Sequence, residues 1–401
     1  MTRRLVLNAN TLGLGQRQAA WNAGGQPAHA LVGPEYWRSL ARTAERGLLD
    51  ALFLADAPLL AEDPSDRATG NLDPTITLAF VAQTTERIGL VATASSTYND
   101  PVELARRMAT VDVLSGGRAA WNVVTTYAPG AGANFGIEGT PPREERYARA
   151  DAFVASVRAL WRGEAVEGES LDAALHGERP ILQAGGSPQG RALAAKHADA
   201  VFTAEMDRAA AAEHYRQVVD AAAAHGRRPR ILPGLSLTLG STEREAQQRF
   251  DDTERLGPEG YGLQRLAGIL GPGLLEAPLD GPVPESLLRD EADAGFAGSL
   301  GFRESMVRFV RETRPTVAEL VRLDGGFGHR SIVGTPDQAA DLIEEWFTAG
   351  IADGFNLMPG VLPQGLEEFV DHVVPLLQAR GLFRREYAET RLTERWARLA
   401  P

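Results

Sequence analysis

The chain contains no cysteine, and this absence removes several chemistries at once. A protein without cysteine has no disulfide, no thiolate metal site and no cysteine nucleophile. The sequence also has no run approaching the roughly 18 apolar residues of a membrane-spanning helix. Its start, MTRRLVLNANTLGLG, is basic but has neither a long apolar run nor a clear cleavage pattern. We therefore expect a soluble, cytoplasmic protein with no membrane partner.

The sequence also lacks a basic excess. Its 41 lysine and arginine residues face 53 aspartate and glutamate residues, which gives a formal net charge of -12 and a pI near 5.2. Nucleic-acid binding needs clustered basic side chains to neutralise phosphates. The charge balance therefore argues against a nucleic-acid partner.

The segment 87–127 is the part around which we interpret the rest of the chain. It begins with the apolar run IGLVATA, continues with PVELARRMATVDVL at helical spacing, breaks at SGG and ends with the apolar run RAAWNVVTT. This order is typical of a strand, a helix and a second strand. Both apolar runs end in small polar residues, which suggests half of a binding site.

Strands and helices alternate eight times along the chain. This count favours a (β/α)8 TIM barrel over an open doubly wound sheet. We expect residues 1–401 to form a single barrel domain with insertions at about 128–146 and 240–330. We place the helix after the first insertion at residues 147–161. Because long loops in compact domains are often functional, both insertions are candidate lids.

Active sites of such barrels lie at the carboxyl ends of the strands. The polar residues expected there are Asp56, Thr93, Asn122, Thr125, Gly185, Gly186, Ser187, Glu205 and Asn356. This rim lacks the matched pair of carboxylates that a glycosidase needs and the histidine cluster of a metal site. A hydrolase on this barrel is therefore the least favoured class.

The sequence QAGGSPQGRALAAKHA carries the sharpest local signal. A strand runs into Gly-Gly-Ser and a helix follows, so free backbone amides at the helix start would suit a phosphate near Gly186 and Ser187. The alternative is a tight turn in which Ser187 only caps the helix. Both interpretations remain open from this segment alone.

Four further residues have both a functional and a structural interpretation. Asp56 could bind a polar edge of a cofactor or cap the next loop. Thr93 could line a ring pocket or satisfy a loop. Tyr147 could point its hydroxyl into the barrel mouth or pack on a helix face, and His329 could be catalytic or structural.

These segments occur together in an order that resembles the bacterial luciferase-like, flavin-dependent monooxygenases. The branch that it resembles includes the nitrilotriacetate, dibenzothiophene sulfone and long-chain alkane monooxygenases. The matching stretches are AERGLLDALFLAD, TERIGLVATASSTYNDPVELARRMATVDVLSGGRAAWNVVT, ANFG with EERY, QAGGSPQGRALAAKHADAVF, VGTPDQAADLIEEW and DGFNLMP. The part from residue 240 to about 328 matches least.

The resemblance implies an enzyme that uses reduced FMN, supplied by a separate NAD(P)H:FMN reductase, and oxygen to oxygenate a small organic substrate. It implies flavin contacts at Asp56, Thr93, Tyr147, Gly186 and Ser187, and a homodimer or homotetramer. A deazaflavin-dependent oxidoreductase of the same superfamily and a flavin-binding protein without turnover are the alternatives.

The chain departs from the family pattern at two places. Arg143, in PPREERY, stands where relatives usually carry a histidine. It could stabilise an anionic reduced flavin or the phosphate, or the exchange could remove a general acid/base. Arg143 therefore joins the expected cofactor contacts, and it joins His329 as a catalytic candidate. Val102 and Glu103 replace a usual Tyr-His pair after the third strand, which suggests a different substrate or a different chemistry.

Overall fold

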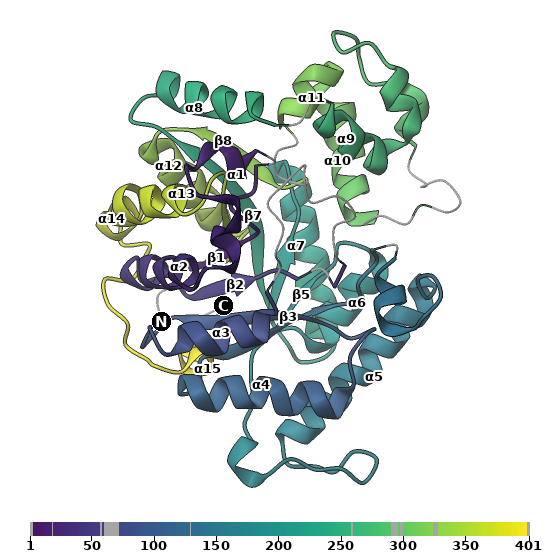
Figure 1. The fold of residues 1–401 in the computed structure, drawn as a ribbon, viewed down its shortest axis with the longest axis vertical. Helices are drawn as coiled ribbons and strands as arrows, with labels where there is room; N and C mark the ends of the chain where they lie inside the picture. Colours follow the sequence, from purple (N-terminus) through teal and green to yellow (C-terminus); the bar gives the residue numbers. More distant parts are fainter. Residues whose placement is uncertain are drawn as a thin grey trace.

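The structure is a computed structural model that describes residues 3–17, 19–56, 58–59, 72–128, 130–257, 260–289, 296, 300–323 and 328–398. Eight parallel strands close into a barrel with helices around it (Figure 1). The ring runs β1-β2-β3-β4-β5-β6-β7-β9 and returns to β1. The strands are β1 (Val6–Thr11), β2 (Ala51–Leu54), β3 (Gly89–Ser95), β4 (Ala119–Val124), β5 (Ile181–Ala184), β6 (Ala200–Thr203), β7 (Arg230–Leu239) and β9 (Gly354–Pro359). The expected (β/α)8 TIM barrel is confirmed.

Almost every strand residue is buried, because the strands face the barrel interior on one side and the helices on the other. The surrounding helices are α2 (Pro34–Arg46), α3 (Pro74–Ala82), α4 (Pro101–Ser115), α5 (Arg143–Trp161), α6 (Pro188–His197), α7 (Arg208–Ala223), α12 (Pro336–Thr348), α13 (Gln364–Glu368) and α14 (Val374–Ala379). Each of α4, α6, α7 and α12 begins after an Asp, Ser or Thr whose side chain accepts a backbone N–H, so local sequence sets these starts.

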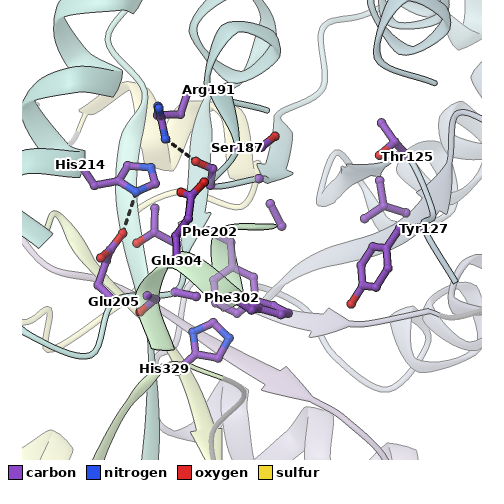
Figure 2. A pocket seen from close by; sticks show the side chains of 18 of the residues that line it. Thr125, Tyr127, Ser187, Arg191, Phe202, Glu205, His214, Phe302, Glu304 and His329 are labelled. Atoms are coloured by element: carbon purple, nitrogen blue, oxygen red, sulfur yellow. Dashed lines mark hydrogen bonds and ion pairs between the residues drawn. The ribbon is translucent and has the colours of Figure 1, made fainter. Parts of the chain in front are cut away.

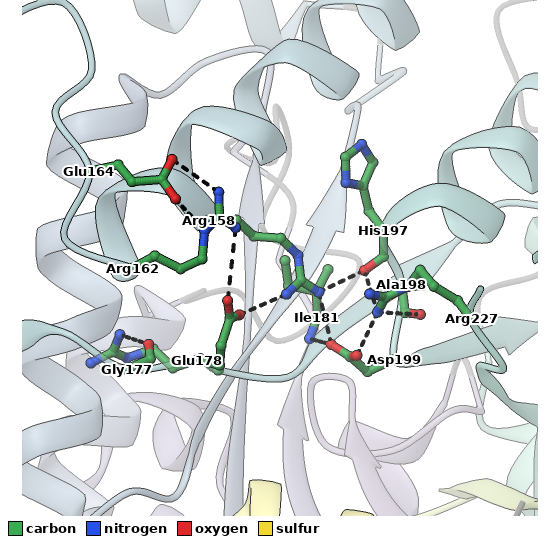
Figure 3. Close-up of polar contacts among 11 residues, drawn as sticks. Arg158, Arg162, Glu164, Gly177, Glu178, Ile181, His197, Ala198, Asp199 and Arg227 are labelled. Atoms are coloured by element: carbon green, nitrogen blue, oxygen red, sulfur yellow. Dashed lines mark hydrogen bonds and ion pairs between the residues drawn. The ribbon is translucent and has the colours of Figure 1, made fainter. Parts of the chain in front are cut away.

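An aspartate before three of the strands ties neighbouring strand starts together. Asp50 precedes β2 and accepts the N–H of Leu7, Asp199 precedes β6 and accepts that of Ile181, and Asp353 precedes β9 and accepts that of Ile231. Each carboxylate also pairs with arginine. Figure 3 shows this around Asp199, which Arg158 and Arg227 contact at 3.1 and 2.6 Å. These charge-assisted bonds hold the amino end of the barrel, opposite to the expected site.

The C-terminal helix α15 (Leu392–Arg398) closes that same end. Its Leu392 and Trp396 pack in one cluster with Val6, Phe53 and Val91 from the barrel interior. Because the amino end is filled by side chains, an open cavity is left to the carboxyl end.

The segment between β7 and α12 contains α8 (Glu243–Arg255), α9 (Tyr261–Leu270), α10 (Leu300–Thr313) and α11 (Val317–Leu323). The helices α9, α10 and α11 form a hydrophobic cluster of their own. It includes Leu266, Met306 and Leu320, together with Met206 of the β6–α7 segment. Figure 1 shows these three helices grouped beyond the rim of the barrel.

Two expectations about the elements were wrong. A short strand β8 (Arg330–Gly334) pairs with the C-terminal half of β7. It was not predicted, because its RSIV run is too short and too half-exposed to show an alternation of apolar and polar residues. The helix expected over 147–161 begins at Arg143, since Pro142 can precede a helix and two glutamates favour its first turn.

Among the described residues, no helix combines the length and apolarity needed to cross a bilayer.

Candidate active site

A cavity of about 370 Å³ opens at the carboxyl ends of the strands. Its volume lies within the usual range for cofactor and ligand pockets. Its wall comes from the ends of β4, β5 and β6, from α5, α6 and α7 of the barrel, and from α10 of the inserted segment. Figure 2 shows the aromatic centre of this pocket and the polar side chains around it.

The Gly-Gly-Ser turn after β5 forms part of the wall. Ser187 is the N-cap of α6, where its Oγ accepts the N–H of Gly190 at 3.1 Å, and its hydroxyl lies 3.4 Å from the Tyr147 hydroxyl. Arg191 donates to the carbonyl of Gly186. Ser187 therefore caps the helix and lines the pocket, so the two interpretations of this turn are compatible.

The first turn of α10 packs against this Gly-Gly-Ser turn. A Cβ atom built on Gly186 would lie 3.1 Å from the Cα of Gly301, and one built on Gly301 would lie 3.0 Å from the Cα of Gly186. Only glycine at both positions allows this approach without displacement of one backbone. The first turn of α10 is thereby held against the start of α6.

His329 lies at the centre of the pocket. Its ring stacks on Phe202 with centroids 5.0 Å apart and meets Phe302 edge-on at 5.8 Å. A hydrogen bond to the backbone of Thr203 favours the charged form, but burial outweighs it and lowers the pKa of His329 to about 4. His329 is therefore neutral at pH 7 and acts there as a neutral imidazole.

Asp56, Arg143, Tyr147, Gly186, Ser187 and His329 all line this one pocket. Thr93 does not. It is buried in the barrel, where its hydroxyl accepts a hydrogen bond from Asn122 at 3.0 Å. Val102 and Glu103 do not line it either, because they lie in the first turn of α4, where Glu103 pairs with Arg106 at the surface.

Sequence reasoning missed one polar side of the pocket. It consists of Glu213, His214 and Gln217 from one face of α7, and of Glu304, Ser305 and Arg308 from one face of α10. Glu205 was expected at a strand end, but its partner His214 was not identified. The polar residues at helical spacing on α7 were the available signal, and they looked like an ordinary solvated face.

Comparison with known proteins decides the family. The model of the luciferase-like monooxygenases matches residues 14–353. The chain belongs to the luciferase-like monooxygenase family. Among related sequences, N-acetyl-S-(2-succino)cysteine monooxygenase of Bacillus subtilis is 37% identical over 98% of this chain and 96% of the relative. Nitrilotriacetate monooxygenase component A of Aminobacter aminovorans is 35% identical over 95% and 93%.

Solved structures of luciferase-like monooxygenases and related flavoproteins agree with this assignment. EDTA monooxygenase from Chelativorans sp. BNC1 superimposes with a TM-score of 0.80 at 31% identity, over 98% of both chains. A riboflavin lyase whose structure contains modified FMN and riboflavin gives a TM-score of 0.81 at 26% identity, over 98% of this chain and 96% of the other. This luciferase-like protein is thus a flavin-dependent monooxygenase of the two-component type.

Proposed function

We propose that the protein uses reduced FMN, delivered by a separate NAD(P)H:FMN reductase, and molecular oxygen to oxygenate a small organic substrate. The observation that supports this proposal most is the pocket itself. It joins a glycine-containing helix start, an apolar aromatic centre and a polar wall at the active end of the barrel. The relatives named as monooxygenases, one of them as a component A, fit the same interpretation.

The residues of the pocket fit FMN in kind. Gly186, Ser187 and the start of α6 would hold the phosphate, with the Tyr147 hydroxyl beside Ser187 and Arg143 supplying positive charge. Asp56 would address the polar edge of the ring system. Thr93 would act from the layer of buried side chains beneath the pocket, because it does not reach the wall. Reduced FMN, when bound, would supply the electrons that activate oxygen.

The protein's own contribution would be orientation and exclusion of water. Phe202, Phe302 and neutral His329 form an apolar centre against which a substrate could pack. Parts of the two insertions, at about 128–146 and 240–330, stand over the pocket, and we propose that they act as its lids within a single barrel domain. Arg143 is a fixed cation, so it would stabilise negative charge and would not exchange protons.

The test is a binding and turnover experiment with the purified protein. We expect tighter binding of reduced than of oxidised FMN under anaerobic conditions. With a flavin reductase and NADH added, we expect one member of a panel of sulfur, amine and alkane compounds to accelerate oxygen consumption beyond hydrogen peroxide release.

Three outcomes would replace this proposal. Efficient NADH oxidation without a reductase would contradict two-component action. Preferential binding of a deazaflavin would indicate hydride transfer. Tight FMN binding without oxygenation of any compound in the panel would indicate a flavin-binding protein without turnover.

A further inference from the structure

A buried glutamate and histidine form a pair in the pocket wall that the proposed function does not use. Glu205 follows β6 and is 5% exposed, and His214 lies on α7 and is 9% exposed. Their Oε1 and Nδ1 atoms are 2.6 Å apart. The other ring nitrogen, Nε2, is buried and has no hydrogen-bond partner among the described residues, although His214 lines the pocket.

This geometry leaves one exchangeable proton. An ionised carboxylate can only accept hydrogen bonds, so Nδ1 of His214 carries the proton that it donates to Glu205. The two protonation states of His214 then differ only at Nε2. A buried polar nitrogen without a hydrogen-bond partner is unfavourable, so a ligand that supplies a partner is favoured.

The surroundings of the pair suggest the kind of ligand. In Figure 2 the ring edge opposite Glu205 faces the side of the pocket on which Arg191 and Ser187 lie. That side contains the start of α6 and, through the Gly186–Gly301 contact, the start of α10. The start of α6, with Arg191 on the same helix, favours anionic oxygen atoms at this wall.

We propose that His214 binds an anionic oxygen of the ligand through Nε2 and takes up a proton from solvent when that ligand binds, with Glu205 as its positioning residue. The proposal rests on the proposed function for the identity of the flavin. The anionic oxygen belongs either to the FMN phosphate or to a substrate carboxylate. In the step one N–H bond forms at Nε2, the proton comes from solvent, and nothing is oxidised or reduced.

Charge explains why uptake is expected. With neutral His214 the pair carries one negative charge, and with protonated His214 it carries none. An anion placed beside the pair therefore favours the protonated state. The other charged side chains of neighbouring elements at this wall are Arg191 of α6, Glu213 of α7, and Glu304 and Arg308 of α10. Carboxyl and guanidinium groups titrate far from pH 8 in model peptides.

The experiment is calorimetric titration of FMN into the full-length protein at pH 8, in buffers that differ in ionisation enthalpy. Phosphate monoesters lose their second proton near pH 6, so uptake at pH 8 reports on the protein. We expect net proton uptake that approaches one proton per site. Between pH 7.5 and 8.5 the Kd for FMN should rise by up to about tenfold per unit of pH.

Variants separate the pair from other causes. His214→Asn should abolish proton uptake and flatten the pH dependence of the Kd, and Glu205→Gln should reduce both. His197→Asn is the matched control. Nε2 of His197 lies 2.6 Å from Oδ1 of Asp151, so this pair has the same length, but it lies at the far end of α6 and does not line the pocket. His197→Asn should leave the uptake unchanged.

Ligand choice distinguishes the source of the anion. Uptake with FMN but not with riboflavin would assign it to the phosphate. Uptake only when succinate is titrated into the FMN complex would assign it to a substrate carboxylate. Absence of uptake with all three probes, or uptake that persists in His214→Asn, would overturn the inference. A failure of FMN to bind in either redox state, with the reduced form tested under anaerobic conditions, would instead count against the proposed function.

Discussion

Replacement of His329 by glutamine should weaken the dependence of stability on pH. The imidazole of an unfolded chain binds a proton below about pH 6.5. In the folded protein burial lowers the pKa of His329 to about 4. Between these values the unfolded state binds more protons, so the free energy of unfolding falls as the pH falls from above 6.5 toward 4.

The shift sets the size of this effect. A difference of roughly 2.5 pKa units corresponds to a loss of about 3.4 kcal/mol once the pH lies below both values. Between pH 8 and 5.8 the same two pKa values give about 1 kcal/mol. The lower pH is set at 5.8 because the pI is about 5.2, and aggregation near the pI would interfere with the measurement.

The assay is urea unfolding followed by tryptophan fluorescence at pH 8 and pH 5.8. His329→Gln should be less stable than the unmodified protein at both pH values, because the stacking with Phe202 is lost. The difference in its free energy of unfolding between pH 8 and pH 5.8 should, however, be smaller than that of the unmodified protein by about 1 kcal/mol. His225→Gln, at an exposed position, is the control and should change nothing. If His329→Gln retains the full pH difference, the neutral buried state of His329 is refuted.

Three further predictions concern single contacts. Asp50→Asn should cost about 3–5 kcal/mol in urea unfolding because Asp50 is fully buried in an ion pair, and Asp199→Asn should cost less because its side chain is 33% exposed. Ser187→Ala should remove a helix cap worth about 1 kcal/mol and weaken FMN binding more than riboflavin binding in a fluorescence titration. Gly301→Ala should push against Gly186 and weaken FMN binding by roughly tenfold, or 1.4 kcal/mol. Unchanged FMN affinity in Gly301→Ala would show that this contact yields without cost.

The barrel was predictable because each unit carries its own local signals. The strands are short apolar runs, and helices such as α4 begin after a capping residue and end at glycine, as at Gly116. These signals are local, and eight repetitions of them leave few alternative folds. The strand β8 escaped prediction because its middle residues are half-exposed and it pairs with only part of β7.

The candidate site was only partly predictable, for a geometric reason. Residues at strand ends, such as Asp56 and Ser187, are brought together by the barrel itself, so the fold alone places them. The residues of α10, such as Glu304 and Arg308, reach the pocket only because the inserted segment folds back over the rim. No local pattern in a Gly- and Leu-rich insertion reveals where its helices dock.

The same division of the pocket separates what the barrel provides from what the inserted segment adds. The turn at Gly186 and Ser187 is formed by a barrel element, and α10 is held against it by a contact between two glycines. A change in α10 therefore alters the substrate side of the pocket and the helix start at α6 together. The Glu205–His214 pair belongs to the β6–α7 unit of the barrel and lines the wall that α10 covers. Substitutions on α10 should thus change substrate preference and flavin affinity together. Substitutions in the Glu205–His214 pair should instead change how ligand affinity depends on pH.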